Sequence, residues 1–226
     1  MAGKLFVIES GTDGSGKATQ TKKLFDRLVE DGYRVRKVEF PNYDSDSSAL
    51  IKMYLNGDFG DKADDVDAYI ASTFYAADRY ASYKLGWEDF YLNGGIILAD
   101  RYTTSNMVHQ ASKMDSPDDK EKCLDWLDDF EYGLYKIPRP DGVFFLDVPL
   151  KVSAKLMEDR KNKFTSGDEK DIHERDLDYL ARTYDNSKYV ADKFKWTQID
   201  CTDGMAMRSV EDINEDIYSR VLESLV

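Results

Sequence analysis

Short apolar runs alternate along the chain with longer segments in which apolar residues recur at helical spacing. The short runs are rich in β-forming residues and predict five strands, over residues 4–9, 33–40, 96–99, 142–148 and 195–200. The longer segments predict helices over residues 17–31, 49–55, 66–87, 150–159, 174–193 and 210–225, with two more between residues 103 and 135. Strands that alternate with helices predict an α/β fold, a three-layer sandwich whose five-stranded, mainly parallel sheet carries helices on both faces.

The chain of 226 residues is long enough for one α/β domain with a sizeable core, and no stretch has the composition of a linker. We therefore expect a single domain over residues 1–226. The segment 160–171 is polar, contains Gly167 and offers little apolar surface for packing. We expect this segment to form a short mobile lid.

The formal net charge of −13 argues against nucleic acid or an acidic membrane surface as a partner, because both require a basic face. No apolar run approaches the ~20 residues of a membrane span. Cys123 and Cys201 lack a metal-binding spacing, and the first predicted strand begins too early to leave room for a signal peptide. These features predict a cytoplasmic protein, which must concentrate its cations locally if its substrates are phosphates.

The most informative stretch follows the first predicted strand and opens the first helix. It reads Gly11-Thr12-Asp13-Gly14-Ser15-Gly16-Lys17-Ala18-Thr19. Glycines let the backbone bend so that successive N–H groups point at phosphate oxygens, and the Lys17 ammonium can reach the β- and γ-phosphates. A glycine turn ahead of a lysine-bearing helix is the plainer alternative, but the flanking strand and helix favour a phosphate-binding loop (P-loop) for ATP.

The residue after Lys17 departs from the usual pattern, in which a Ser or Thr hydroxyl at this position binds Mg²⁺. The position is Ala18, and the next hydroxyl belongs to Thr19. Asp100 ends the third predicted strand, where an acidic residue approaches the Mg²⁺ of a bound nucleotide, although a helix cap or a salt bridge would also explain it. Arg101 beside it is always charged, and in a sheet crevice it needs an anion.

Other positions have plain structural explanations when they are taken alone. Phe74 and Arg79 lie about 140° apart around a helix, so periodicity predicts a core position for Phe74 and a solvated one for Arg79. A histidine such as His109 is more often a helix residue with satisfied hydrogen bonds than a ligand. The basic run that begins at Arg160 would by default be a solvated surface patch.

The joint set of motifs resembles the thymidylate kinase family. The resemblance rests on the glycine loop together with Asp100-Arg101-Tyr102-x-x-Ser105, Phe40-Pro41, residues 74–79 (Phe-Tyr-Ala-Ala-Asp-Arg), residues 138–141 (Pro-Arg-Pro-Asp) and residues 146–148 (Leu-Asp-Val). These motifs stand in the family's order and cover nearly the whole chain. The resemblance implies an adenylate-kinase-like fold, a homodimer, and transfer of the γ-phosphoryl of ATP to thymidine monophosphate (dTMP) with Mg²⁺ as cofactor.

The resemblance also implies a role for each matching residue. Arg101 would hold phosphoryl oxygens, and Asp13 would face the sugar 3′-hydroxyl. Phe74 would stack on the thymine, and Arg79 would contact the base or its phosphate. The remaining positions of the expected substrate site are Phe40 and Ser105, the latter near the base.

Three features of the chain depart from the family pattern. His109 stands where relatives usually have Tyr or Phe, a ring that crowds a ribose 2′-hydroxyl. Tyr43 stands where many relatives carry an Arg, which weakens the transfer of a phosphate contact to this position. None of residues 12–15 is basic, so the missing cation is expected from the lid, with Arg160 favoured because its planar fork can bridge two phosphates.

The predicted chemistry needs no strong general base, because the acceptor is an ionised phosphate monoester. Mg²⁺, Lys17 and Arg101 would position the reacting groups and neutralise their charge. A deoxynucleoside kinase would need a carboxylate base near the end of the second strand, where Glu39 is available. A catalytically inactive nucleotide-binding regulator is the second alternative, because of Ala18. A GTPase switch is excluded, since residues 162–165 (Asn-Lys-Phe-Thr) lack the Asp of the guanine motif.

Overall fold

The computed structural model describes residues 2–163, 172–204 and 206–225. Its central sheet contains five strands in the order β2-β3-β1-β4-β5, and every neighbouring pair is parallel. The strands are β1 (Lys4–Glu9), β2 (Val35–Glu39), β3 (Ile96–Asp100), β4 (Gly142–Asp147) and β5 (Thr197–Asp200). This confirms the predicted five-stranded sheet. The antiparallel pair β6 (Thr202–Asp203) and β7 (Ala206–Met207) was not predicted.

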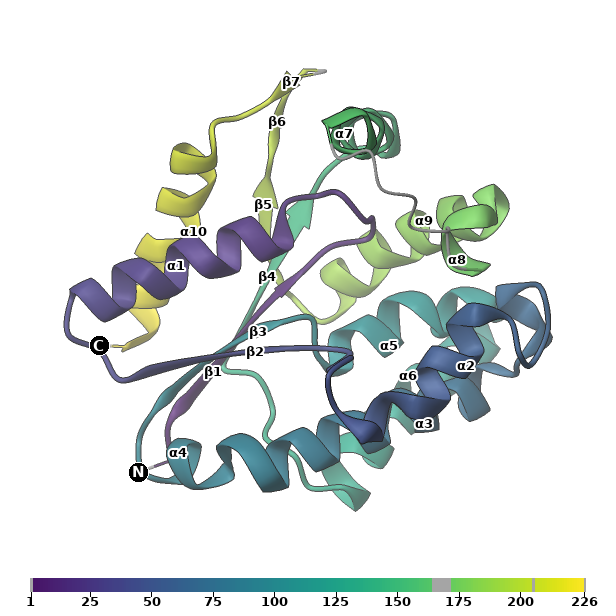
Figure 1. Ribbon diagram of the computed structural model, residues 1–226, viewed down its shortest axis with the longest axis horizontal. Coiled ribbons are helices and arrows are strands. Elements are labelled where there is room, and N and C mark those ends of the chain that lie inside the picture. Colours follow the sequence, from purple (N-terminus) through teal and green to yellow (C-terminus); the bar gives the residue numbers. More distant parts are fainter. Residues whose placement is uncertain (1, 164–171, 205, 226) are drawn as a thin grey trace.

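Ten α-helices are assigned within the described part of the chain, and they surround the sheet (Figure 1). They are α1 (Lys17–Glu30), α2 (Ala49–Asn56), α3 (Ala68–Ser82), α4 (Glu88–Leu92), α5 (Thr103–His109), α6 (Pro117–Asp128), α7 (Leu150–Lys163), α8 (Ile172–Arg175), α9 (Leu177–Lys193) and α10 (Val210–Leu225). The helix predicted over residues 66–87 begins later, because the Asp67 carboxylate caps α3 by accepting from the backbone N–H groups of Tyr69 and Ile70. It also continues beyond α3 as a π-helical turn, Tyr83–Trp87.

Alternate side chains of the central strands point to opposite faces of the sheet, as the pleat requires. Leu5 and Val7 of β1 belong to a core shared with residues of α5, α6 and α9. Phe6 and Ile8 belong to the opposite core, which includes residues of α1, α7 and α10. Both faces of β1 are therefore buried, which explains why its sequence is an unbroken apolar run rather than an alternating one.

A third, smaller core joins α2, α3 and α8 beside the sheet. Helices α2 and α3 lie on the side toward which the central strands point their carboxyl ends (Figure 1). Among the described helices, none combines the length and the apolar character that a membrane span requires. The segment expected to form the lid, residues 160–171, lies outside the described residues from position 164 onward.

Candidate active site

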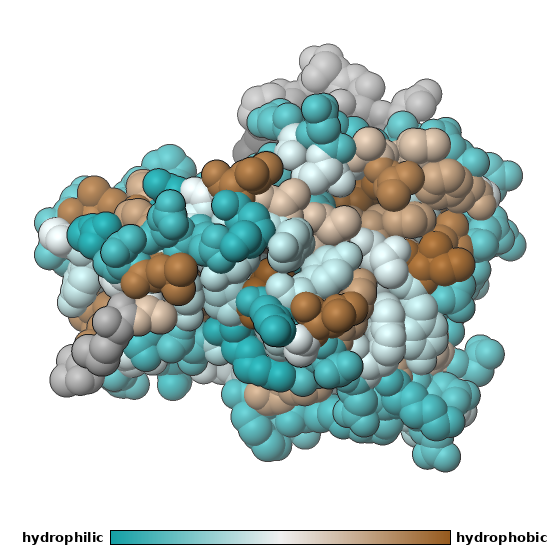
Figure 2. Space-filling view, turned by 90° about the horizontal axis from the view of Figure 1, so that it is seen from below, coloured by the Kyte–Doolittle hydropathy of each residue, from teal (hydrophilic) through white to brown (hydrophobic). Residues whose placement is uncertain are grey.

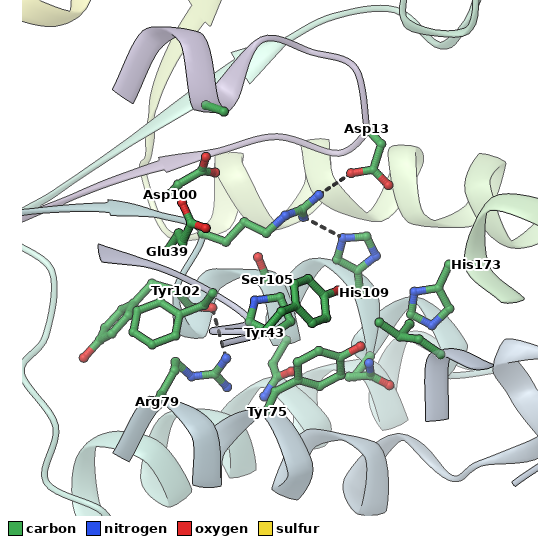
Figure 3. A pocket seen from close by; sticks show the side chains of 17 residues that line it. Asp13, Glu39, Tyr43, Tyr75, Arg79, Asp100, Tyr102, Ser105, His109 and His173 are labelled. Atoms are coloured by element: carbon green, nitrogen blue, oxygen red, sulfur yellow. Dashed lines mark hydrogen bonds and ion pairs between the residues drawn. The ribbon is translucent and has the colours of Figure 1, made fainter. Parts of the chain in front are cut away.

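A cavity of about 420 Å³ lies between the carboxyl ends of β2 and β3, the start of α1, and the helices α3 and α5. Its walls bring together residues that are far apart in the sequence (Figure 3). The lining residues predicted from sequence are Asp13, Ala18, Phe40, Arg79, Asp100, Arg101, Ser105 and His109. Open α/β sheets bind ligands at this edge, so the position fits the prediction.

The glycine loop between β1 and α1 has the backbone shape of a phosphate cradle. Gly16 has a φ of 91°, in the left-handed region, at the N-cap of α1. Nothing lies within 4 Å of the position where a Cβ would stand, so the backbone conformation, rather than space, requires glycine here. At Gly11 the reason is space, because a Cβ would lie 2.1 Å from the Ser187 hydroxyl oxygen.

The Lys17 ammonium is folded into its own loop. It donates hydrogen bonds to the Ser10 hydroxyl (2.8 Å) and to the carbonyl oxygen of Thr12 (3.0 Å). Burial, followed by repulsion from Arg101, lowers the pKa of Lys17 to about 8. Ala18 stands where a Ser or Thr hydroxyl usually binds Mg²⁺, and Thr19 carries the next hydroxyl in the sequence. Thr19 is exposed and does not line the cavity, whereas Ala18 does.

Arg101 lies at the centre of the charged end of the cavity. Its φ of 65° is unusual for a residue other than glycine, and its backbone N–H donates to the Ile8 carbonyl oxygen at the end of β1 (3.1 Å). The guanidinium is hydrogen-bonded to Asp13 and, at 3.2 Å, to Nε2 of His109 (Figure 3). Although burial opposes ionisation of Asp13, Arg101 and Lys17 hold the pKa of its carboxyl below the usual range.

Glu9 lies beneath the loop and was not singled out by the sequence. Its fully buried carboxylate accepts hydrogen bonds from the Ser10 backbone N–H (3.0 Å), the Thr104 hydroxyl (2.7 Å) and the Ser105 hydroxyl (2.6 Å). It also lies 3.7 Å from Arg101. Ser105 thus joins α5 to the end of β1 in this structure. A buried carboxylate this well bonded holds the end of β1 in place.

Two carboxylates that line the cavity, as Ala18 does, stand at the ends of adjacent strands. Glu39 of β2 is paired in register with Asp100 of β3, and both line the cavity (Figure 3). Burial raises the pKa of Asp100, and the cations of Lys17 and Arg101 partly offset this effect. Carboxylate oxygens are the ligands that Mg²⁺ prefers, so the donors present at this edge fit the metal although the usual hydroxyl is missing.

The other end of the cavity is built around Arg79, and here the periodicity argument was wrong. Arg79 is not solvated: its side chain is 2% exposed and its guanidinium pairs with Glu131, which is 1% exposed. Nε of Arg79 donates to Glu131 Oε2 at 2.9 Å, and a second bond joins NH2 to Oε1. The amide nitrogen of Asn106 also donates to Glu131 Oε1 (3.1 Å). The buried partner carboxylate explains how a charge can occupy this position.

The aromatic residue of α3 in the cavity wall is Tyr75, and this corrects the placement of Phe74. The ring of Phe74 packs on Phe59, with centroids 5.8 Å apart, and Phe74 is not among the lining residues. Tyr75 precedes Arg79 by four residues, so the two share one face of the helix. The i, i+4 spacing was the signal in the sequence that could have selected Tyr75.

Two histidines line the cavity, and their hydrogen bonds define their protonation states. Arg101 can only donate, so Nε2 of His109 accepts and its ring proton is on Nδ1. Nε2 of His173, a residue that sequence reasoning missed, lies 3.0 Å from the Tyr54 hydroxyl. That hydroxyl donates to the Ala63 carbonyl oxygen, so His173 must donate to it. Burial, with nearby cations second, lowers the pKa of both rings, that of His173 to about 3.

Arg160 belongs to α7, but its side chain lies outside the described part of the structure. Its catalytic role and the lid therefore stay predictions.

Comparison with known proteins identifies the family. The family model "Thymidylate kinase" matches residues 8–217. The chain belongs to the thymidylate kinase family. Enzymes of this family phosphorylate dTMP to dTDP with ATP, which confirms the function expected from the motifs.

Individual relatives agree with this assignment. The chain is 27% identical to the thymidylate kinase of Homo sapiens over 95% of its length and 88% of the relative. It is 28% identical to a probable thymidylate kinase of Staphylothermus marinus, over 98% of this chain and 96% of the other. Among solved structures, thymidylate kinase from Candida albicans matches with a TM-score of 0.72 and 21% identity, covering 98% of this chain and 92% of that one. This structural match confirms the predicted fold.

Proposed function

We propose that this chain, acting as a single domain, transfers the γ-phosphoryl group of ATP to dTMP in the cavity described above, with Mg²⁺ as cofactor. The observation that carries the proposal is the position of Arg101. Its guanidinium lies between the glycine loop, through Asp13, and the α5 wall, through His109. A cation at this junction can contact a phosphoryl group that passes between two bound nucleotides.

The residues of the charged end have distinct roles in this proposal. Lys17 leaves Ser10 and Thr12 to hold the β- and γ-phosphoryl oxygens of ATP, and the loop N–H groups hold the remaining oxygens. Arg101 exchanges its Asp13 partner for the acceptor phosphate, which releases Asp13 to face the sugar. When bound, Mg²⁺ neutralises charge on the triphosphate, and Asp100 and Glu39 are the residues that would hold it, directly or through water.

At the end of the cavity built around Arg79, the thymine lies between Phe40 and Tyr75, with Tyr75 taking the stacking role predicted for Phe74. Arg79 is held by Glu131 through Nε and NH2, and its NH1 donates a long hydrogen bond to the Tyr102 carbonyl oxygen (3.4 Å), which it would exchange for the base. His109 lies beside the sugar and limits the space at the 2′ position. Arg160 remains the proposed lid cation.

A turnover screen tests the proposal. ADP release should be measured with ATP and a panel of nucleoside monophosphates, with thymidine itself as a control. We expect dTMP to give the highest kcat/KM, with activity abolished by removal of Mg²⁺. A higher kcat/KM with thymidine would favour a deoxynucleoside kinase, for which Glu39 is the available base. Binding of ATP and dTMP without turnover would indicate an inactive nucleotide-binding protein.

We also propose that the protein is a homodimer that uses the face of α3. Figure 2 views the molecule from the side of α3, α4 and α6 and shows apolar side chains (brown) among polar ones. The large apolar residues exposed on and after α3 are Ile70, Tyr80 and Leu85, the last 90% exposed. Sedimentation equilibrium should give twice the mass of the chain. An Ile70→Glu, Leu85→Glu variant should sediment as a monomer, and an unchanged mass would contradict the proposed interface.

The proposed location is the cytoplasm. Both cysteines are buried and free of disulfide bonds, which fits a reducing compartment. Cell fractionation with an antibody against the chain would test this proposal.

A further inference from the structure

Tyr179 is a residue of α9 that takes no part in the interactions described so far. Its side chain is fully buried and does not line the cavity. The Asp176 carboxylate accepts from the backbone N–H of Tyr179 (2.9 Å), which caps the start of α9. The Tyr179 ring packs on the ring of His173, with centroids 4.8 Å apart. Tyr179 is thus held in place by both its backbone and its ring.

The hydroxyl of Tyr179 lies beside His109, a residue of the cavity wall. Its oxygen is 3.4 Å from Nδ1 of His109 and 3.4 Å from the His109 carbonyl oxygen. The other ring nitrogen, Nε2, accepts from Arg101 (3.2 Å). The imidazole therefore connects a residue outside the cavity with the arginine at its charged end.

The donors and acceptors of this chain of hydrogen bonds fit together in one direction. Nε2 accepts from Arg101, so the ring proton is on Nδ1, and Nδ1–H donates to the Tyr179 oxygen. The Tyr179 O–H is then available to donate to the His109 carbonyl oxygen. Burial, followed by repulsion from Arg101 and His173, lowers the pKa of His109 and so keeps its ring neutral. At 3.4 Å the two tyrosine contacts are long and contribute little to folding, so their main consequence is the choice of tautomer.

The tautomer of His109 matters because the guanidinium of Arg101 can only donate. In the other tautomer Nε2 would carry the proton, two N–H groups would face each other, and Arg101 would lose this partner. A neutral acceptor also differs from the carboxylates of Asp13 and Glu9, the latter 3.7 Å from Arg101. It orients the guanidinium without cancelling the charge that stabilises a phosphoryl group.

We propose that Tyr179 is a positioning residue, whose hydroxyl keeps the proton of His109 on Nδ1 and thereby keeps Nε2 as the acceptor that orients Arg101. The inference rests on the proposed function, since it takes Arg101 as the cation that contacts the transferred group. When Arg101 exchanges Asp13 for the acceptor phosphate, His109 is the partner that remains. Tyr179 itself touches neither substrate.

The tautomer can be measured directly, because the chain contains two histidines. Two-bond ¹⁵N–¹H correlation spectra of the imidazole rings distinguish Nδ1–H from Nε2–H, and His173→Gln assigns the two signals. In the wild type we expect His109 as Nδ1–H and His173 as Nε2–H. Tyr179→Phe removes the hydroxyl alone. It should shift His109 toward Nε2–H and leave His173 unchanged.

Steady-state kinetics tests the consequence for Arg101. Tyr179→Phe should lower kcat about 5-fold, the scale of one hydrogen bond, and leave the KM for ATP unchanged. His109→Gln replaces the imidazole by an amide, whose oxygen is an acceptor in every state. In this background Tyr179→Phe should change kcat by less than about 2-fold, because the tautomer that Tyr179 selects no longer exists.

Tyr184→Phe is the matched control on the same helix. The Tyr184 hydroxyl donates to Asp147 Oδ1 (3.2 Å), which is not connected to His109. This variant should leave both the His109 signal and kcat unchanged. Melting temperatures of the two variants should lie close to that of the wild type, which excludes a general loss of structure as the cause of a lower kcat.

Three outcomes would overturn the inference. One is a wild-type spectrum with His109 as Nε2–H, a result that needs no variant and stands even if Tyr179→Phe does not fold. Another is an unchanged His109 tautomer in Tyr179→Phe, since a lower kcat would then come from packing. The third is a wild-type kcat in Tyr179→Phe despite a shifted tautomer. Failure of the wild type to phosphorylate dTMP would instead refute the proposed function, which the turnover screen detects separately from the spectra.

Discussion

The cavity contains two arginines whose surroundings differ, although both are paired with carboxylates. Arg79 and Glu131 are 2% and 1% exposed and are joined by two hydrogen bonds. Arg101 is 19% exposed, and its partner Asp13 is 39% exposed. A fully buried pair cannot give up a partner without leaving an unpaired charge, whereas a partly exposed pair can exchange its carboxylate for a phosphate. The first pair therefore fixes a wall, and we propose that the second serves as an exchangeable anion site.

The largest difference should appear when each pair loses its carboxylate. Glu131→Gln leaves the Arg79 charge buried with one weaker acceptor, and we expect a loss of about 3–5 kcal/mol in the free energy of unfolding. Asp13→Asn should lose less than about 1 kcal/mol, because water reaches that pair. Urea unfolding curves of the two variants measure both values. Equal losses would show that the two pairs are energetically alike.

Removal of the Arg101 guanidinium should mainly reduce catalysis. We expect Arg101→Met to lower kcat/KM for dTMP by about 10²–10³-fold, or ~3–4 kcal/mol of transition-state stabilisation. Arg101→Lys should recover only part of this loss, because an ammonium cannot replace the planar fork. Steady-state kinetics gives both numbers, and urea unfolding should show a stability close to that of the wild type. A fully active Arg101→Met enzyme would refute the proposed role.

Asp100 should act through the metal instead of through either arginine. We expect Asp100→Asn to lower kcat by about 10²-fold or more, an effect of about 3 kcal/mol, with a weaker dependence on Mg²⁺. Glu39→Gln, at the paired position on β2, is the matched control and should have a smaller effect. The measurement is kcat as a function of Mg²⁺ concentration. A wild-type Mg²⁺ response in Asp100→Asn would exclude this residue from the metal site.

The smallest expected effect is a proton taken up by Lys17. Its pKa is about 8 in the free protein, and the phosphates of bound ATP stabilise the charged ammonium and raise it. Near pH 8.5 part of the free protein lacks this proton, so ATP binding should take up a fraction of a proton, and the uptake should vanish below about pH 7. Calorimetry in two buffers of different ionisation enthalpy measures it. Lys17→Met should abolish the uptake; if it persists, another group is responsible.

The end of the cavity that holds Asp100 and Arg101 could be predicted from the sequence. The surroundings of Arg79 at the other end could not. Asp100 ends β3 and Arg101 follows it, while Lys17 opens the helix that follows β1 and the glycine loop, and the apolar runs locate these strands. Arg79 depends instead on a carboxylate 52 residues away, which local periodicity cannot detect. The same limit applies to Glu9, whose partners come from α5, because only the folded chain brings these groups together.

The position of β1 in the sheet has a consequence for how the protein is made. Phe6 lies opposite Leu98 on one side and Gly142 on the other, so the first strand has both neighbours only after β4 has been synthesised. Until then the nascent chain carries an apolar strand with an unpaired edge, the state most prone to aggregation on the ribosome. Slowing translation after residue 147 should therefore help folding, whereas a stall before it would prolong the exposed state.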